Sequence, residues 1–111
     1  MKRIALAEVP AEGVSHNPEI TKQVILRRGD LPHLTNFSRS QLLPGQVSRA
    51  HRHIDLFEVF LVESGVGVMK VDGHEERLEA GICVVVEPGE VHEIINTGST
   101  ELVLLYFGIE E

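Results

Sequence analysis

The stretch from Gly45 to Gly65, GQVSRAHRHIDLFEVFLVESG, decides the interpretation of the chain because it places His51, His53 and Glu58 within eight residues. One residue separates the two histidines, so on a β-strand both imidazoles would point to the same face. The four residues 54–57 then give the chain room to turn before Glu58 starts a returning strand. Two imidazoles and a carboxylate that converge on one point form most of a divalent-metal site.

The chain on either side of this stretch predicts short strands separated by glycine and proline turns. Pro44-Gly45 is a strong turn signal, Asp72-Gly73 is typical of a hairpin, and no segment has a persuasive helical period. Strands at this spacing indicate an all-β sandwich or barrel. The expected strands span residues 19–28, 34–43, 47–53, 56–63, 66–71, 75–78, 82–86, 91–97 and 102–107.

A chain of 111 residues has room for one domain. We expect residues 20–111 to form that domain and residues 1–19 to form an irregular N-terminal arm, with a short strand over residues 3–6. His16 stands beside Asn-Pro and is expected to be a turn residue rather than a ligand.

The composition argues against several classes of partner. A net charge of −7 and a pI near 5.3 disfavour binding to nucleic acid or to an anionic membrane, which both need a positive surface. No apolar run approaches the roughly 18 residues of a membrane span, and the N-terminus has no apolar core of a signal peptide. The single cysteine, Cys83, allows no intrachain disulfide, which agrees with a cytoplasmic location. The expected partner is therefore a small molecule.

Two of the expected strands carry apolar residues on both faces. Over residues 56–63, Phe57 and Leu61 lie on one face, while Phe60 and Val62 share the face of Glu58. The last strand is apolar on both faces as well. A strand buried on both sides lies between two layers or faces a partner subunit, and in so small a protein this favours a homodimer.

The spacing of glycines and ligand-type residues repeats a pattern known from one family. From Gly45 the chain has the spacing G-x5-H-x-H-x4-E-x6-G, and from Gly81 a second pattern leads through Gly89 to His92 and Asn96. These stretches resemble the two conserved motifs of the cupin superfamily, G-x5-H-x-H-x3,4-E-x6-G and G-x5-P-x-G-x2-H-x3-N. One position departs from the second motif, since Glu87 stands where the family has proline and Pro88 follows it.

The resemblance to small single-domain cupins implies a fold and a ligand set. The fold would be a double-stranded β-helix, a jelly-roll-like β-barrel, with a metal inside its mouth. The implied metal ligands are His51, His53, Glu58 and His92. The alternation of residues along the expected strand agrees with this ligand set, because His92, Ile94 and Asn96 share one strand face and His92 could point inward.

Three neutral imidazoles and one carboxylate suit a divalent transition metal. Mn, Fe, Ni, Co and Zn all accept this donor set, whereas Ca and Mg prefer oxygen ligands, and the sequence does not choose among the five. Four protein ligands leave two positions open in a six-coordinate metal, enough for a bidentate substrate or for a substrate with dioxygen. Glu58 is also a candidate proton acceptor if it detaches.

These features predict that the protein is a metal-dependent enzyme of dioxygenase, isomerase or lyase type that acts on a small oxygenated or carboxylated substrate. Similar sites in the family serve quercetin and acireductone dioxygenases and oxalate-degrading enzymes, but this chain is shorter and shows no lid acid, so the resemblance implies a site and not a substrate. The alternative is a non-catalytic cupin module that binds or senses a small ligand or sugar. A third hypothesis is a metal with a purely structural role.

Several further residues carry open alternatives. Arg49 shares the parity of the two histidines and could reach an anionic substrate, or it could be solvated, whereas Arg52 has the opposite parity. Asn96 is expected to support a turn. Cys83 is expected to be a small buried hydrophobe. His33 is expected in a loop and His74 at an exposed hairpin tip, and neither has ligand spacing.

The strand over residues 34–43 allows two orientations. If Leu42 points inward, Asn36, Ser38 and Ser40 do too and offer hydrogen-bonding groups to a ligand. The opposite parity would place residues 37, 39 and 41 inside.

Overall fold

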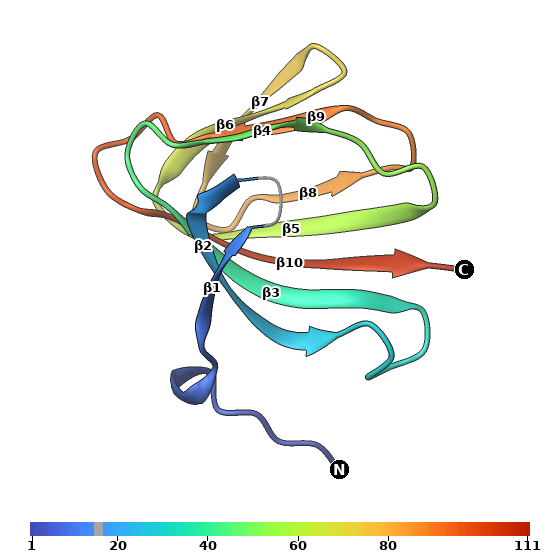
Figure 1. Ribbon diagram of the computed structural model, residues 1–111. Coiled ribbons are helices and arrows are strands. Elements are labelled where there is room, and N and C mark those ends of the chain that lie inside the picture. The colour runs from blue at the N-terminus through green and yellow to red at the C-terminus, as the bar shows by residue number, and fades with distance from the viewer. Residues whose placement is uncertain (15–16) are drawn as a thin grey trace.

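The computed structural model describes residues 1–14 and 17–111, and almost all of its regular structure is β-strand (Figure 1). His16, expected in a turn, lies outside the described residues. The strands are β1 (Ala11–Val14), β2 (Asn17–Arg27), β3 (Leu34–Leu42), β4 (Val47–His51), β5 (Leu56–Ser64), β6 (Val66–Val71), β7 (His74–Glu79), β8 (Cys83–Val86), β9 (His92–Ile95) and β10 (Leu102–Glu110).

The strands form two antiparallel sheets that face each other. One sheet has the order β1-β2-β3-β10-β5-β8 and the other the order β4-β9-β6-β7. Figure 1 shows the four-stranded sheet lying over the longer one, with β4 and β9 above β5 and β8. The predicted all-β, double-stranded β-helix is thereby confirmed.

The alternation of the strands determines which side chains enter the core between the sheets. In β5, Glu58, Phe60 and Val62 are buried, whereas Phe57 and Leu61 on the opposite face are 44% and 41% exposed. This is the parity that the sequence predicts. The apolar core comprises Val14, Ile20, Leu42, Phe60, Val62, Met69, Leu78, Val86, Ile94, Leu102 and Leu104.

The N-terminal segment is more ordered than predicted. The expected strand over residues 3–6 is wrong, because residues 1–5 have no regular structure and a short 3-10 helix covers Leu6–Glu8. The arm predicted over residues 1–19 is also only partly irregular, since β1 pairs with β2 at the edge of the six-stranded sheet. β1 is four residues long with the sequence AEGV, too short to show a hydrophobic period, and its partner strand supplies its hydrogen bonds.

Cys83 is exposed, so its expected burial is wrong. It lies opposite Leu61 in the pairing of β8 with β5, and both side chains point away from the core. Val84 and Val86 occupy the inward positions of β8. An apolar strand sequence alone does not indicate which parity faces the core.

Among the described residues, no helix has the length and apolar character needed to cross a membrane.

Candidate metal centre

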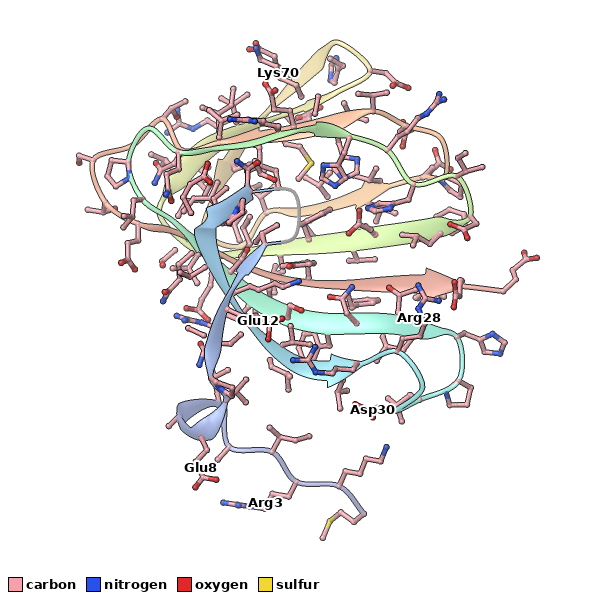
Figure 2. The ribbon with its side chains drawn as sticks, viewed as in Figure 1. Arg3, Glu8, Glu12, Arg28, Asp30 and Lys70 are labelled. Atoms are coloured by element: carbon pink, nitrogen blue, oxygen red, sulfur yellow. The ribbon has the colours of Figure 1, made fainter. Side chains whose placement is uncertain are left out.

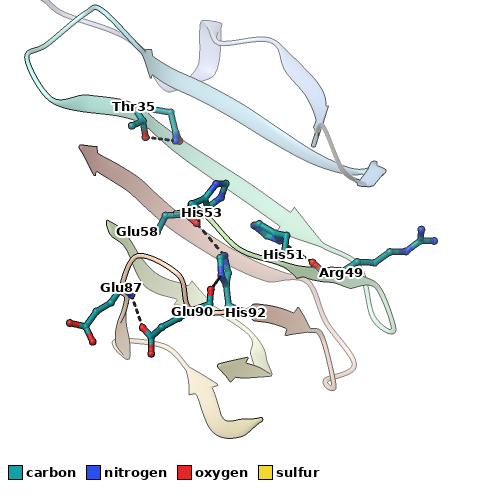
Figure 3. A network of polar contacts seen from close by, with 9 residues as sticks. Thr35, Arg49, His51, His53, Glu58, Glu87, Glu90 and His92 are labelled. Atoms are coloured by element: carbon teal, nitrogen blue, oxygen red, sulfur yellow. Dashed lines mark hydrogen bonds and ion pairs between the residues drawn. The ribbon is translucent and has the colours of Figure 1, made fainter. Parts of the chain in front are cut away.

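Four potential ligands meet where the two sheets approach each other. His51 ends β4, His53 follows it in the loop, Glu58 lies on β5, and His92 begins β9. One ligand atom from each lies within 4.8 Å of the others. Figure 3 shows the three imidazoles and the carboxylate turned toward one another. The structure therefore brings together all four residues that the motifs single out.

Backbone pairing holds the histidines side by side. His51 and His92 are cross-strand partners between β4 and β9, and their ring centroids are 4.2 Å apart. The N–H of Gly89 donates to the carbonyl of His53 at 2.7 Å, which ties the loop of His53 to the turn before β9. Gly89 has φ = 85°, a left-handed conformation that favours glycine.

Two of the histidines are oriented by backbone carbonyls two residues earlier. Nδ1 of His51 lies 2.9 Å from the carbonyl of Arg49, and Nδ1 of His92 lies 3.3 Å from the carbonyl of Glu90. A carbonyl only accepts hydrogen bonds, so each Nδ1 carries the proton and each Nε2 keeps its lone pair for a metal.

Glu58 and His92 each present a potential metal-ligand atom that has no hydrogen-bond partner within the described residues. Oε1 of Glu58 lies 3.1 Å from Nε2 of His92 and 3.2 Å from Nε2 of His53. Yet among the described residues Oε1 of Glu58 and Nε2 of His92 are buried without a partner in hydrogen-bonding geometry. Such groups are costly to bury, and a shared cation would satisfy both. The donor set fits a transition metal such as Mn, Fe, Co, Ni or Zn.

Electrostatics around Glu58 favour its charged form. Burial raises the pKa of this carboxyl group, but the neighbouring His92, His53 and His51 outweigh that effect and lower the pKa below its ordinary value. The side chain therefore remains a carboxylate, the form in which it ligates metals.

A cavity of about 170 Å³ opens beside the cluster. Polar and apolar side chains from both sheets form its wall. The lining residues are Val14, Ile20, Lys22, Asn36, Ser40, Leu42, Ser48, His51, His53, Glu58, Phe60, Ile94, Leu104 and Tyr106. A ligand in this cavity would contact the exposed side of the cluster, because His92 is 1% exposed and lies behind the wall.

The inward orientation of Asn36, Ser38 and Ser40 is confirmed. Ser38 and Ser40 are buried together with Leu42, and Asn36 and Ser40 line the cavity. Arg39, from the other parity, instead pairs with Glu63 at 2.7 Å.

Of the two alternatives for Arg49, the structure supports the solvated side chain and not the reach into the site. Its side chain is exposed and points away from the cluster (Figure 3), while its backbone N–H donates to Oδ1 of Asn17 at 3.0 Å. Between Ser48 and His51 the β4–β9 register shifts by one residue, so Ser48 and His51 both face inward despite their unequal parity. This β-bulge reverses the alternation on which the expectation for Arg49 depended.

Asn96 has the supporting role that the sequence predicts. Its Nδ2 donates to the carbonyls of Leu42 and Thr100, both at 2.9 Å, and its Oδ1 accepts from the N–H of Gly98. The side chain thus connects the turn after β9 to the end of β3.

Sequence reasoning missed three polar residues of the cavity wall, Lys22, Ser48 and Tyr106. Lys22 shares the parity of buried Ile20 on β2, so alternation from that core residue would have found it. Tyr106 stacks on Phe60 with ring centroids 5.4 Å apart. Burial raises the pKa of Tyr106 to about 12, and a hydrogen bond with Ser38 offsets only part of this effect.

The fold and the cluster define a class of protein: a small two-sheet β-barrel with three imidazoles and one carboxylate gathered at a cavity between the sheets. The sequence pattern described as the cupin domain matches residues 38–108. The chain therefore belongs to the cupin family.

Individual relatives show which proteins the chain is similar to. It is 36% identical over 69 residues to an "Oxalate-binding protein" of Thermotoga maritima, a match that spans 62% of this chain and only 57% of that protein. The structure of a predicted oxalate decarboxylase from Thermotoga maritima superposes with a TM-score of 0.91 and 26% identity, covering 99% of this chain and 100% of the other. A polyketide cyclase from Streptomyces resistomycificus shares the fold, with a TM-score of 0.83, 21% identity and coverage of 100% and 80%.

Proposed function

We propose that this protein is a metal-dependent cupin enzyme that acts on a small carboxylated substrate at the His51, His53, Glu58 and His92 cluster. The observation that carries the proposal is a pair of buried ligand atoms without a hydrogen-bond partner, Oε1 of Glu58 in the cavity wall and Nε2 of His92 behind it. We also propose that the metal is a single divalent transition ion.

The residues around the cluster have different roles in this proposal. When bound, the metal would act as a Lewis acid that polarises substrate oxygens. His51 and His92 present Nε2 because their Nδ1 atoms are held by carbonyls. Phe60 forms an apolar wall that limits water around the substrate. Tyr106 keeps its proton at neutral pH, because its pKa is raised to about 12, and offers a hydroxyl at the cavity wall.

The size of the cavity favours a small substrate. An apolar protein cavity of about 150 Å³ holds one benzene molecule, and the cavity beside Glu58 measures about 170 Å³. Oxalate or a short 2-oxo acid would fit within this space, whereas a flavonol would have to extend outside. The names of the two Thermotoga maritima relatives, one oxalate-binding and one a predicted oxalate decarboxylase, support a short carboxylate as the substrate.

A binding protein without catalysis is the second candidate function. Glu58 is the sole carboxylate in the cavity wall of residues 1–14 and 17–111, and it belongs to the ligand set. A second acid for proton transfer is therefore missing from the described wall, and the relative that binds oxalate is named for binding alone.

Turnover and binding assays on metal-loaded protein separate the two functions. We would offer oxalate, 2-oxo acids, diketones, uronates and flavonols with each of Mn, Fe, Co, Ni and Zn, and follow oxygen consumption and product formation. The enzyme proposal expects turnover of a short carboxylate that is lost in His51→Ala and kept in His74→Ala, a control because His74 is exposed on β7. Tight binding of a carboxylate with no turnover under any metal would contradict the enzyme and support the binding protein.

We further propose that the outer face of the six-stranded sheet forms the interface of a homodimer. Phe57, Leu61, Val85 and Ile109 are each at least 41% exposed there, on the neighbouring strands β10, β5 and β8. Ile109 pairs with Phe57, and Val85 pairs with Val59 next to it, so the apolar residues form a continuous patch. Contiguous exposed patches of this kind usually mark interfaces.

A further inference from the structure

We propose that Lys22 and Ser40 form a second binding subsite in the cavity that holds an anionic group at the far end of the substrate. The inference rests on the proposed function, since it assumes that the other end of the substrate binds at the metal cluster. It specifies the substrate class as a molecule with two anionic ends.

Lys22 is the only cationic side chain among the described residues of the cavity wall. It lies on β2 two residues after Ile20, which is 1% exposed, so the same parity directs both side chains inward. Lys22 is half-buried and lines the cavity. In a chain of net charge −7, a lysine directed into the cavity beside the cluster is a specific attraction for an anion.

The acid that could neutralise Lys22 is already engaged. Glu12 on β1 is its cross-strand neighbour, but the Glu12 carboxylate accepts a hydrogen bond from Arg27 at 2.9 Å. Within the two described ranges, 1–14 and 17–111, no side chain forms an ion pair or hydrogen bond with the Lys22 ammonium. Lys22 is therefore available to an anionic group of a ligand in the cavity that it lines.

Ser40 adds a hydrogen-bond donor beside Lys22. It is the direct partner of Lys22 in the β2–β3 pairing, and both residues line the cavity. Ser40 as a residue is only 5% exposed, but its hydroxyl is not one of the fully buried atoms, and it forms no hydrogen bond among the residues that the structure describes. A carboxylate oxygen in the cavity would accept hydrogen bonds from this hydroxyl and from Lys22 together.

The subsite is separate from the metal cluster. Along the six-stranded sheet, Lys22 on β2 is three strands away from Glu58 on β5. The two places also differ in their position along the strands. Ser40 pairs with Leu104 of β10, whereas Glu58 pairs with Gly108, four residues further along the same strand. One anionic group cannot contact both places, so a substrate that uses both needs a chain between a metal-binding end and a second anion.

The test compares two ligands that differ only at the distal end. 2-Oxoglutarate and 2-oxopentanoate offer the same 2-oxo acid to the metal, but only the first has a distal carboxylate. Oxalate offers the metal-binding group without a tail. Calorimetric titration of the Zn²⁺-loaded protein measures all three affinities without turnover, and thermal unfolding and metal content are checked for every variant.

We expect the native protein to bind 2-oxoglutarate about tenfold to a hundredfold more tightly than 2-oxopentanoate, as for a hydrogen bond between charged groups. Lys22→Met should abolish this preference and leave oxalate affinity unchanged, Lys22→Arg should retain most of it, and Ser40→Ala should reduce it. Lys70→Met is the matched control, because Lys70 lies on β6 at the top of the view in Figure 2, away from Glu12 on β1.

An equal preference in native protein and Lys22→Met, or no preference in the native protein, would overturn the distal subsite while oxalate binding still supported the proposed function. Failure of oxalate and both 2-oxo acids to bind the Zn²⁺-loaded protein would overturn the proposed function, and the subsite with it.

Discussion

At the scale of single residues, the environment of each polar side chain determines the form in which it acts. Two carbonyls fix the protonated nitrogens of His51 and His92, and three imidazoles keep Glu58 ionised although it is buried. Tyr106 is held in the opposite state, because burial disfavours its phenolate. The cavity thus combines a carboxylate ready to bind a metal with a phenol that keeps its proton.

The state of Tyr106 can be measured directly, since it is the only tyrosine and the chain has no tryptophan. We expect the ultraviolet absorbance of tyrosinate to appear with a midpoint near pH 12 in the folded protein, against about 10 for an exposed tyrosine. Because the pKa of Tyr106 is higher in the folded than in the unfolded protein, its protonated hydroxyl stabilises the fold. This contribution is complete below about pH 10, the pKa in the unfolded chain, and is lost as the pH rises through the pKa in the folded protein. A folded-state midpoint at the ordinary value would show that Tyr106 is not buried against Phe60.

At the scale of elements, the alternation of side chains along the strands explains which orientations the sequence predicts correctly and which it does not. Glu58, Phe60 and Val62 point inward as expected, and so do Ser38 and Ser40. The β4 bulge has no signature in the sequence, so the orientation of Arg49 could not be predicted. The motif spacing still identified His51 and His53, because a family pattern already contains the effect of the bulge.

The features that could not be predicted, the order of β1 and the orientation of β8, depend on pairing with strands distant in the sequence or on the position in the sheet. β1 is ordered by β2, and no local signal in Ala11–Val14 distinguishes it from an irregular arm. Cys83 was misplaced because β8 is apolar at both parities and lies at a sheet edge, where one face is left uncovered. The cavity residue Lys22 differs from these, because its parity with buried Ile20 on β2 is a signal that the sequence does contain.

Two glycines of the first motif should respond differently to alanine. Gly65 has φ = 87°, and an added Cβ would overlap the carbonyl oxygen of Glu101 and lie 2.8 Å from Cα of Leu102. Gly45 has a similar φ of 82° with open space around it. We expect Gly45→Ala to cost about 1–2 kcal/mol of unfolding free energy from backbone strain alone, and Gly65→Ala to cost clearly more. Equal losses in denaturant unfolding would contradict the close approach at Gly65.

At the scale of the whole molecule, the two faces of the six-stranded sheet have different roles. The inner face packs on the four-stranded sheet and forms the wall of the cavity, while the outer face exposes Phe57, Leu61, Val85 and Ile109. We expect this outer face to be buried in a homodimer, an arrangement that would leave the cavity within each subunit.

The dimer is tested by a charge on the outer face. We expect sedimentation to report a dimer for the native protein and a monomer for Leu61→Lys, because a lysine in the apolar patch would be buried without a partner. Leu31→Lys is the matched control, since Leu31 is 45% exposed in the loop between β2 and β3, against 41% for Leu61. A monomeric native protein at micromolar concentration, or a dimer that survives Leu61→Lys, would rule out this interface.

The central claim is that His51, His53, Glu58 and His92 bind one transition metal, and metal content tests it most directly. The measurement is elemental analysis of protein purified anaerobically with Mn, Fe, Co, Ni and Zn supplied, together with an anomalous difference map at the cluster. We predict about one metal ion per chain between the four side chains, and an affinity at least tenfold to a hundredfold lower in Glu58→Gln. The exposed control Glu8→Gln should keep the native affinity. Metal-free protein after this loading, or a metal bound away from the cluster, would contradict the claim.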